Sequence, residues 1–63
     1  MLQQLVSQHA GQYQVSLWDK GGNYMMQVHK GDALIFERQV DDRRQYADLY
    51  GRLTEVLAEA GVA

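Results

Sequence analysis

The longest regular pattern of apolar positions lies in residues 42–60. The apolar residues are spaced three or four apart, which places them on one face of a helix. They are Tyr46, Leu49, Tyr50, Leu53, Val56, Leu57 and Ala60. Asp42, with Gln45 three residues later, has the form of a capping box, and Gly61 suits the position just past a helix end. The pattern predicts one long amphipathic helix.

Before this helix the period of the pattern changes to two. Polar and apolar residues alternate over residues 12–17, 23–29 and 33–40, as they do in half-buried strands. Turns at residues 19–23 and 30–32 contain glycine and separate these runs. Short turns between neighbouring strands force an antiparallel meander. The side chains predicted to face the helix are Tyr13, Val15, Leu17, Tyr24, Met26, Val28, Leu34, Phe36 and Val40.

The first residues of the chain have a different spacing. Four of them share a helical face, namely Leu2, Leu5, Val6 and His9. Gly11 suits the C-terminal end of a short helix. The sequence therefore predicts a single small α+β domain over residues 1–63. Its expected order is α-β-β-β-α, a three-stranded antiparallel meander packed on one long C-terminal helix, with a short N-terminal helix.

Length and composition narrow the functional classes. A chain of 63 residues buries only about 60% of its unfolded surface, so a homodimer or a protein partner is an expected source of further stability. The absence of cysteine excludes disulfides and thiolate metal sites. The longest apolar run covers residues 33–36, far short of the roughly 20 residues that span a bilayer. We expect no membrane segment and a cytoplasmic location.

No arrangement of residues predicts catalysis or cofactor binding. His9 and His29 are isolated in the sequence, and general acid–base chemistry needs a partner group within hydrogen-bond reach. The Lys20-Gly21-Gly22 run connects two predicted strands, whereas a phosphate loop leads into the N-terminus of a helix. The sequence therefore predicts a protein that is not an enzyme and carries no cofactor or metal.

Two predicted surfaces are candidates for binding another protein. The first is a stripe of small residues along the back of the long helix: Ala47, Gly51, Thr54 and Ala58. Small residues let another element approach closely, although alanine is also simply a good helix former. The second surface is the outer face of the sheet, where alternation places Trp18, Met25 and Ile35. Trp and Met are typical of interface centres, unless the short N-terminal helix covers them.

A nucleic-acid-binding surface is the alternative hypothesis. It would use a local basic rim made of Lys20, Lys30, Arg38, Arg43 and Arg44, because phosphate contacts depend on Lys and Arg. The formal net charge is −2 and the pI is near 5.4, which disfavours this reading. Acidic residues also interrupt the rim, namely Asp32, Glu37, Asp41 and Asp42.

Three stretches give the chain a general resemblance to known small domains: residues 15–24, 36–42 and 46–50. Their spacing resembles the β-β-β-α units of HicB-type antitoxins, of plant APETALA-type DNA-binding domains and of some phage-encoded anti-CRISPR inhibitors. The double-stranded-RNA-binding domain has the same α-β-β-β-α order, but its Lys-Lys-x-Ala-Lys helix start is replaced here by residues 42–46. The resemblance implies a small inhibitor or regulator of a larger intracellular complex.

Overall fold

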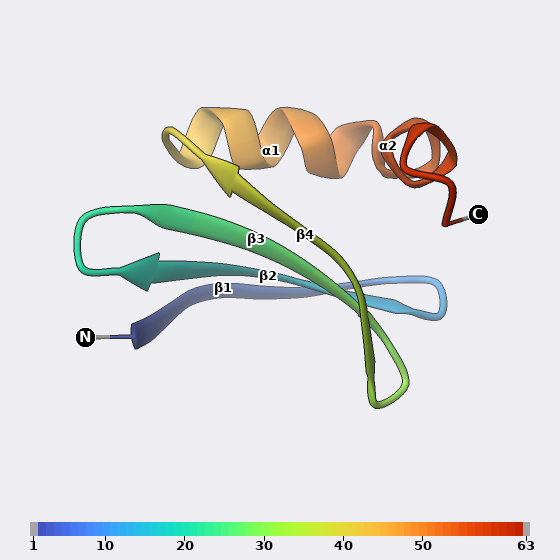
Figure 1. Ribbon diagram of the computed structural model, residues 1–63, viewed down its shortest axis with the longest axis horizontal. Coiled ribbons are helices and arrows are strands. Elements are labelled where there is room, and N and C mark those ends of the chain that lie inside the picture. Colours follow the sequence, from blue (N-terminus) through green and yellow to red (C-terminus); the bar gives the residue numbers. More distant parts are fainter. Residues whose placement is uncertain (1, 63) are drawn as a thin grey trace.

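The computed structural model describes residues 2–62. A single antiparallel sheet with the strand order β1-β2-β3-β4 is followed by two short helices (Figure 1). Both helices lie on the same side of the sheet, and the opposite side has no helix over it (Figure 1). The elements are β1 (Leu2–Ala10), β2 (Tyr13–Lys20), β3 (Tyr24–Lys30), β4 (Ala33–Val40), α1 (Arg43–Gly51) and α2 (Leu53–Glu59). The predicted α+β class and antiparallel meander are confirmed.

The predicted N-terminal helix is wrong, because this segment forms the strand β1 and the sheet has four strands instead of three. β1 pairs with β2 from Leu2 to Ala10, with a register shift between Gln4 and Val6. A bulge of this kind adds one residue to the strand and reverses its alternation. The apolar residues on either side of the bulge therefore acquire a spacing that resembles a helix. Gly11, with φ 62°, forms the turn into β2.

The predicted long helix is also wrong in one respect, because it divides at Gly51 and Arg52 into α1 and α2. Arg52 has φ −116° and ψ 28°, and its N–H is shared between the carbonyls of Asp48 and Leu49 at 3.2 Å each. Figure 1 shows α1 lying across the view and α2 end-on, so the two axes point in different directions. Sharp bends in helices occur at glycine, which lacks the helix propensity of alanine.

The start of α1 follows the predicted cap closely. The Asp42 side chain accepts a hydrogen bond from the Gln45 backbone N–H at 2.9 Å. The Gln45 side chain accepts one from the backbone N–H of Asp41 at 2.7 Å, one residue earlier than in a capping box. These bonds pair two backbone donors at the junction between β4 and α1, and so fix where the helix begins.

One core lies between the helices and the covered face of the sheet. It consists of Val15, Leu17, Met26, Val28, Val40, Tyr46, Leu49, Leu53, Val56 and Leu57. Each of these residues was expected to be inward from its spacing. Leu34 was also expected inward but is 49% exposed, because the pairing of β4 shifts between Val28 and His29. Ile35 takes up the extra position and packs against the core instead.

Gly51 offers a test of whether the helix break needs glycine. A Cβ built at Gly51 meets no atom within 4 Å. We expect Gly51→Ala to raise the free energy of unfolding by about 0.5–1 kcal/mol, because alanine is the better helix former. Chemical denaturation checks this, with Ala47→Gly on the exposed face of α1 as a matched control that should lose a similar amount. A destabilised Gly51→Ala protein would show that the bend between α1 and α2 requires glycine.

Candidate functional site

The helix-free side of the sheet has no other described element over it (Figure 1). We call it the open face. Cross-strand pairing assigns its residues, because directly opposed residues project to the same side. From β1 to β4 they are Leu2, Gln4, Ser7, His9, Gln14, Ser16, Trp18, Lys20, Met25, Gln27, His29, Leu34, Glu37 and Gln39. The composition is dominated by amide, hydroxyl and imidazole groups, with Trp18 and Met25 on the two central strands near the β2–β3 turn.

The Trp18 side chain is hydrogen-bonded to its own strand. Its indole N–H donates a hydrogen bond to the Ser16 hydroxyl at 3.1 Å. Ser16 is only 3% exposed, although it is on the side that has no helix. Met25 is directly opposite Trp18 on the neighbouring strand, and both side chains are half-buried. Trp18 and Met25 thus form an apolar pair across two strands. The Ser16 hydroxyl next to this pair already accepts the hydrogen bond of the indole N–H.

The rest of the open face is held by hydrogen bonds between strands. The Gln14 amide donates to the Ser7 hydroxyl at 3.1 Å, and the Gln27 amide donates to a Glu37 carboxylate oxygen at 2.6 Å. The ammonium group of Lys20 is 4.0 Å from the same Glu37 oxygen. Both members of this ion pair are exposed, so it adds little stability. It does neutralise the single carboxylate of the open face.

The predicted outer-face trio is only partly brought together. Trp18 and Met25 are cross-strand neighbours as expected, whereas Ile35 packs against the core. Leu34 occupies an open-face position beside His29 instead. The sequence did contain a signal for this exchange. Four consecutive apolar residues at positions 33–36 cannot all alternate regularly, so an irregularity was implied there.

The predicted small-residue stripe is exposed but divided. Ala47 and Gly51 belong to α1, and Thr54 and Ala58 belong to α2. The bend between the two helices therefore prevents the four residues from forming one straight surface. Gly51 and Thr54 line a groove of about 460 Å³ between the helix junction and the β1–β2 turn.

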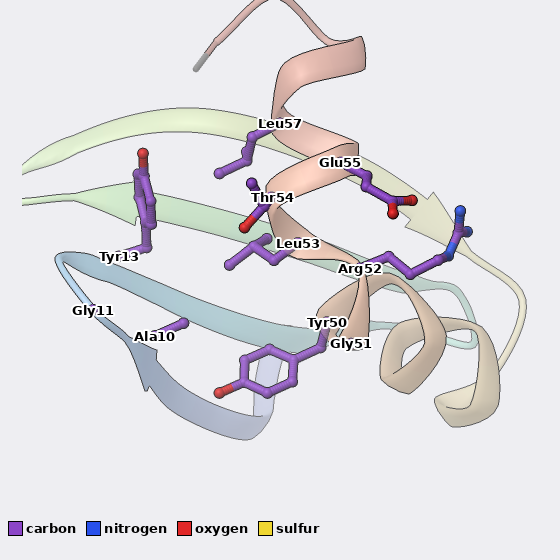
Figure 2. A pocket seen from close by; sticks show the side chains of 10 residues that line it. All are labelled: Ala10, Gly11, Tyr13, Tyr50, Gly51, Arg52, Leu53, Thr54, Glu55 and Leu57. Carbon is purple, nitrogen blue, oxygen red and sulfur yellow. The ribbon is translucent and has the colours of Figure 1, made fainter.

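Tyrosine rings stand on two sides of this groove. Figure 2 shows Tyr13 rising from β2 and Tyr50 extending from α1 toward β1, with Leu53 and Leu57 directed into the space between. The Tyr50 hydroxyl donates to the backbone carbonyl of His9 at 3.3 Å. The groove therefore has an apolar floor. The Arg52 guanidinium at its margin is bound to Asp48 at 2.8 Å, and this hydrogen bond raises the pKa of Arg52.

A second tyrosine connects α1 to β1 from within the core. The Tyr46 hydroxyl donates to the Gln8 side-chain oxygen at 2.7 Å, and its ring stacks on Tyr50 with 6.3 Å between centroids. Burial, with a smaller contribution from Tyr50, raises the pKa of Tyr46 to about 12. The phenol is therefore neutral at ordinary pH and acts as a structural hydrogen-bond donor.

The five basic residues of the alternative hypothesis do not share one face of the sheet. Lys20 has the parity of the open face, whereas Arg38 is opposite Met26 on the covered face. Lys30 is at the far end of β3, next to the β3–β4 turn. Arg43 and Arg44 are exposed in the first turn of α1. Of the five, only Arg43 and Arg44 are consecutive in the sequence.

Comparisons with models of protein families, with curated proteins and with solved structures give no match to this chain. Among residues 2–62, neither helix has the length and apolar character needed to cross a membrane. Over the same described residues, no group of three His, Cys, Asp or Glu side chains lies close enough together to hold a metal ion.

Proposed function

We propose that this protein is a non-enzymatic protein-binding module, a small inhibitor or regulator of a larger complex, and that it binds its partner through the open face. The observation that carries the proposal is the Trp18–Met25 pair on the two central strands of a sheet face that no helix covers. Aromatic residues and Met are enriched where interfaces are buried most deeply. Trp18 and Met25 are half-buried, and apolar surface that is rimmed by polar residues is typical of binding sites.

The polar surroundings of this pair also suit a protein partner. Glutamine, serine and histidine side chains supply both donors and acceptors, and such groups adapt readily to a partner's polar atoms. The open-face residues on β1 to β4 include no arginine or lysine apart from Lys20 at the margin, which is paired with Glu37. A phosphate backbone would find few contacts there.

The size of the molecule is compatible with this role. Figure 1 looks down the shortest dimension and shows the helices stacked on the sheet, so the open face extends over the longest and the shortest dimensions, 30 and 17 Å. The backbone outline of this face is thus smaller than the roughly 800 Å² that each partner buries in a standard interface. The open face therefore suits an interface at the small end of the range.

The function is tested by affinity capture from bacterial lysate, with and without nuclease, followed by mass spectrometry. We expect a protein partner that remains bound after nuclease treatment. Trp18→Ala should weaken binding by about 30-fold or more, as truncation of a central interface aromatic costs at least about 2 kcal/mol. Binding is measured with the purified partner by calorimetry.

A matched control distinguishes binding through the open face from binding through the basic residues. Arg44→Ala removes an exposed side chain of α1 and should leave the affinity within about twofold, because isolated exposed charges contribute little. If capture instead disappears with nuclease, and if Arg44→Ala weakens binding while Trp18→Ala does not, the partner is a nucleic acid and the open-face proposal is wrong.

A further inference from the structure

The two edges of the sheet differ in how they are protected from pairing with another strand. β1 and β4 are the edge strands. β4 contains Glu37 and Arg38, and charged side chains discourage pairing along an edge. β1 contains no aspartate, glutamate, lysine, arginine or proline over its 9 residues. An uncharged edge strand of this length is an available template for another strand.

The backbone of β1 is regular after its bulge. Residues 6–10 pair with β2 without a register shift, and the turn that follows has two residues, Gly11 and Gln12. In a ladder closed by a two-residue turn, the flanking pair is hydrogen-bonded, and bonded pairs alternate with unbonded ones. Ser7 and His9 therefore direct their N–H and C=O groups away from β2. The contact of the Tyr50 hydroxyl with the His9 carbonyl agrees with this direction.

We propose that β1 pairs antiparallel with β1 of a second copy of this chain, about a two-fold axis at Gln8. Ser7 then lies opposite His9 of the second copy, and each such pair exchanges both backbone hydrogen bonds. The His9 carbonyl, which accepts a hydrogen bond from the Tyr50 hydroxyl, uses its second lone pair for the Ser7 N–H of the second copy. The arrangement joins two four-stranded sheets into one continuous sheet. Because β1 carries no charged side chain, the two copies meet without repulsion at the contact, although each chain has a formal net charge of −2.

We infer that the strand pairing with β1 belongs to a second copy, because two identical antiparallel strands are complementary to each other about a two-fold axis. The helix layer also leaves room for one. Tyr50 reaches the free edge at His9, and Ala47, three residues earlier on α1, shares that side of the helix. Ala47 is exposed and small, so α1 presents no bulky side chain at that position to a second copy. A small domain also gains stability by association.

The first experiment measures mass by sedimentation equilibrium up to about 1 mM, a range that detects even weak dimers. We expect a species of twice the 7.2 kDa chain mass. His9→Pro removes the outward N–H and should weaken the dimer at least tenfold, whereas His9→Ala keeps that N–H and should associate like the wild type. A protein that remains at 7.2 kDa, or equal association of the two variants, overturns the proposal.

The second experiment does not depend on the folding of His9→Pro. The chain has no cysteine, so Ser7→Cys and His9→Cys proteins can be mixed and mildly oxidised. We expect disulfide-linked dimers to form at least ten times faster in this mixture than with Gln39→Cys, an exposed position on β4. Equal rates would show that β1 is not the contact.

Discussion

Replacement of Leu17 with alanine is expected to lower the free energy of unfolding by about 2–5 kcal/mol, the usual cost of removing a buried leucine side chain. Leu17 is 0% exposed and lies on a central strand, opposite Val6 on one side and Met26 on the other. A domain of 63 residues has a total stability of about 3–9 kcal/mol. The variant should therefore lose a large part of its stability, and its urea midpoint, followed by circular dichroism, should be well below that of the wild type.

Leu34→Ala is the matched control for this prediction. The same side chain is removed from a β4 position that is 49% exposed, and the loss should be below about 1 kcal/mol, since surface substitutions have small effects. If Leu34→Ala and Leu17→Ala cost the same, Leu34 would belong to the core, and the bulge that turns it to the open face would be wrong.

Alkaline pH is expected to destabilise the protein through Tyr46. Burial raises its pKa from 10.0 to about 12 in the folded state. Between these values the folded protein retains a proton that the unfolded chain releases, so stability falls as pH rises. Below pH 10 the contribution is complete, and above pH 12 about 2–3 kcal/mol is lost, at 1.36 kcal/mol per pKa unit. Urea titrations at pH 9 to 12 measure this loss.

Tyr46→Phe isolates that contribution from other groups that titrate in the same range. The variant loses the hydrogen bond to Gln8, which should cost about 0.5–1.5 kcal/mol at neutral pH. Its stability should then fall less steeply than that of the wild type above pH 10, so that the two curves converge. Parallel curves would show that the hydroxyl of Tyr46 titrates normally in the folded protein.

The parts of the fold that follow from local periodicity were predictable. Alternation over β2 and β3 identified Val15, Leu17, Met26 and Val28 as core residues, and all four are fully buried. The cap at Asp42 correctly marked the start of α1. These features depend on residues within a few positions of one another, so the sequence carries them directly.

The parts that failed depend on pairing between distant residues. β1 contains a bulge at Leu5 whose position is set by its register with β2, and the apolar spacing around it looks helical. The second bulge exchanges Leu34 and Ile35 between the faces of β4. Neither bulge has a glycine to mark it. Periodicity alone therefore misassigned one element and two side chains.

In the candidate site, too, the features that depend on local alternation were predictable and those that depend on distant pairing were not. Trp18 and Met25 were placed on one face by alternation, and the structure makes them cross-strand neighbours. The small-residue stripe assumed a straight helix and is divided by the bend at Gly51 and Arg52. The exposed edge of β1 was not foreseen, because the segment had been assigned to a helix. Its uncharged composition becomes informative only once it is a strand.

Photo-crosslinking in cells tests binding through the open face most directly. A photoreactive amino acid replaces Gln39, which is exposed on the open face opposite Met25, or Glu59, which is exposed on α2. We expect a covalent adduct between position 39 and a different protein, no adduct at position 59, and loss of the adduct when Trp18→Ala is added. Adducts at Glu59 alone, or with nucleic acid alone, would contradict it.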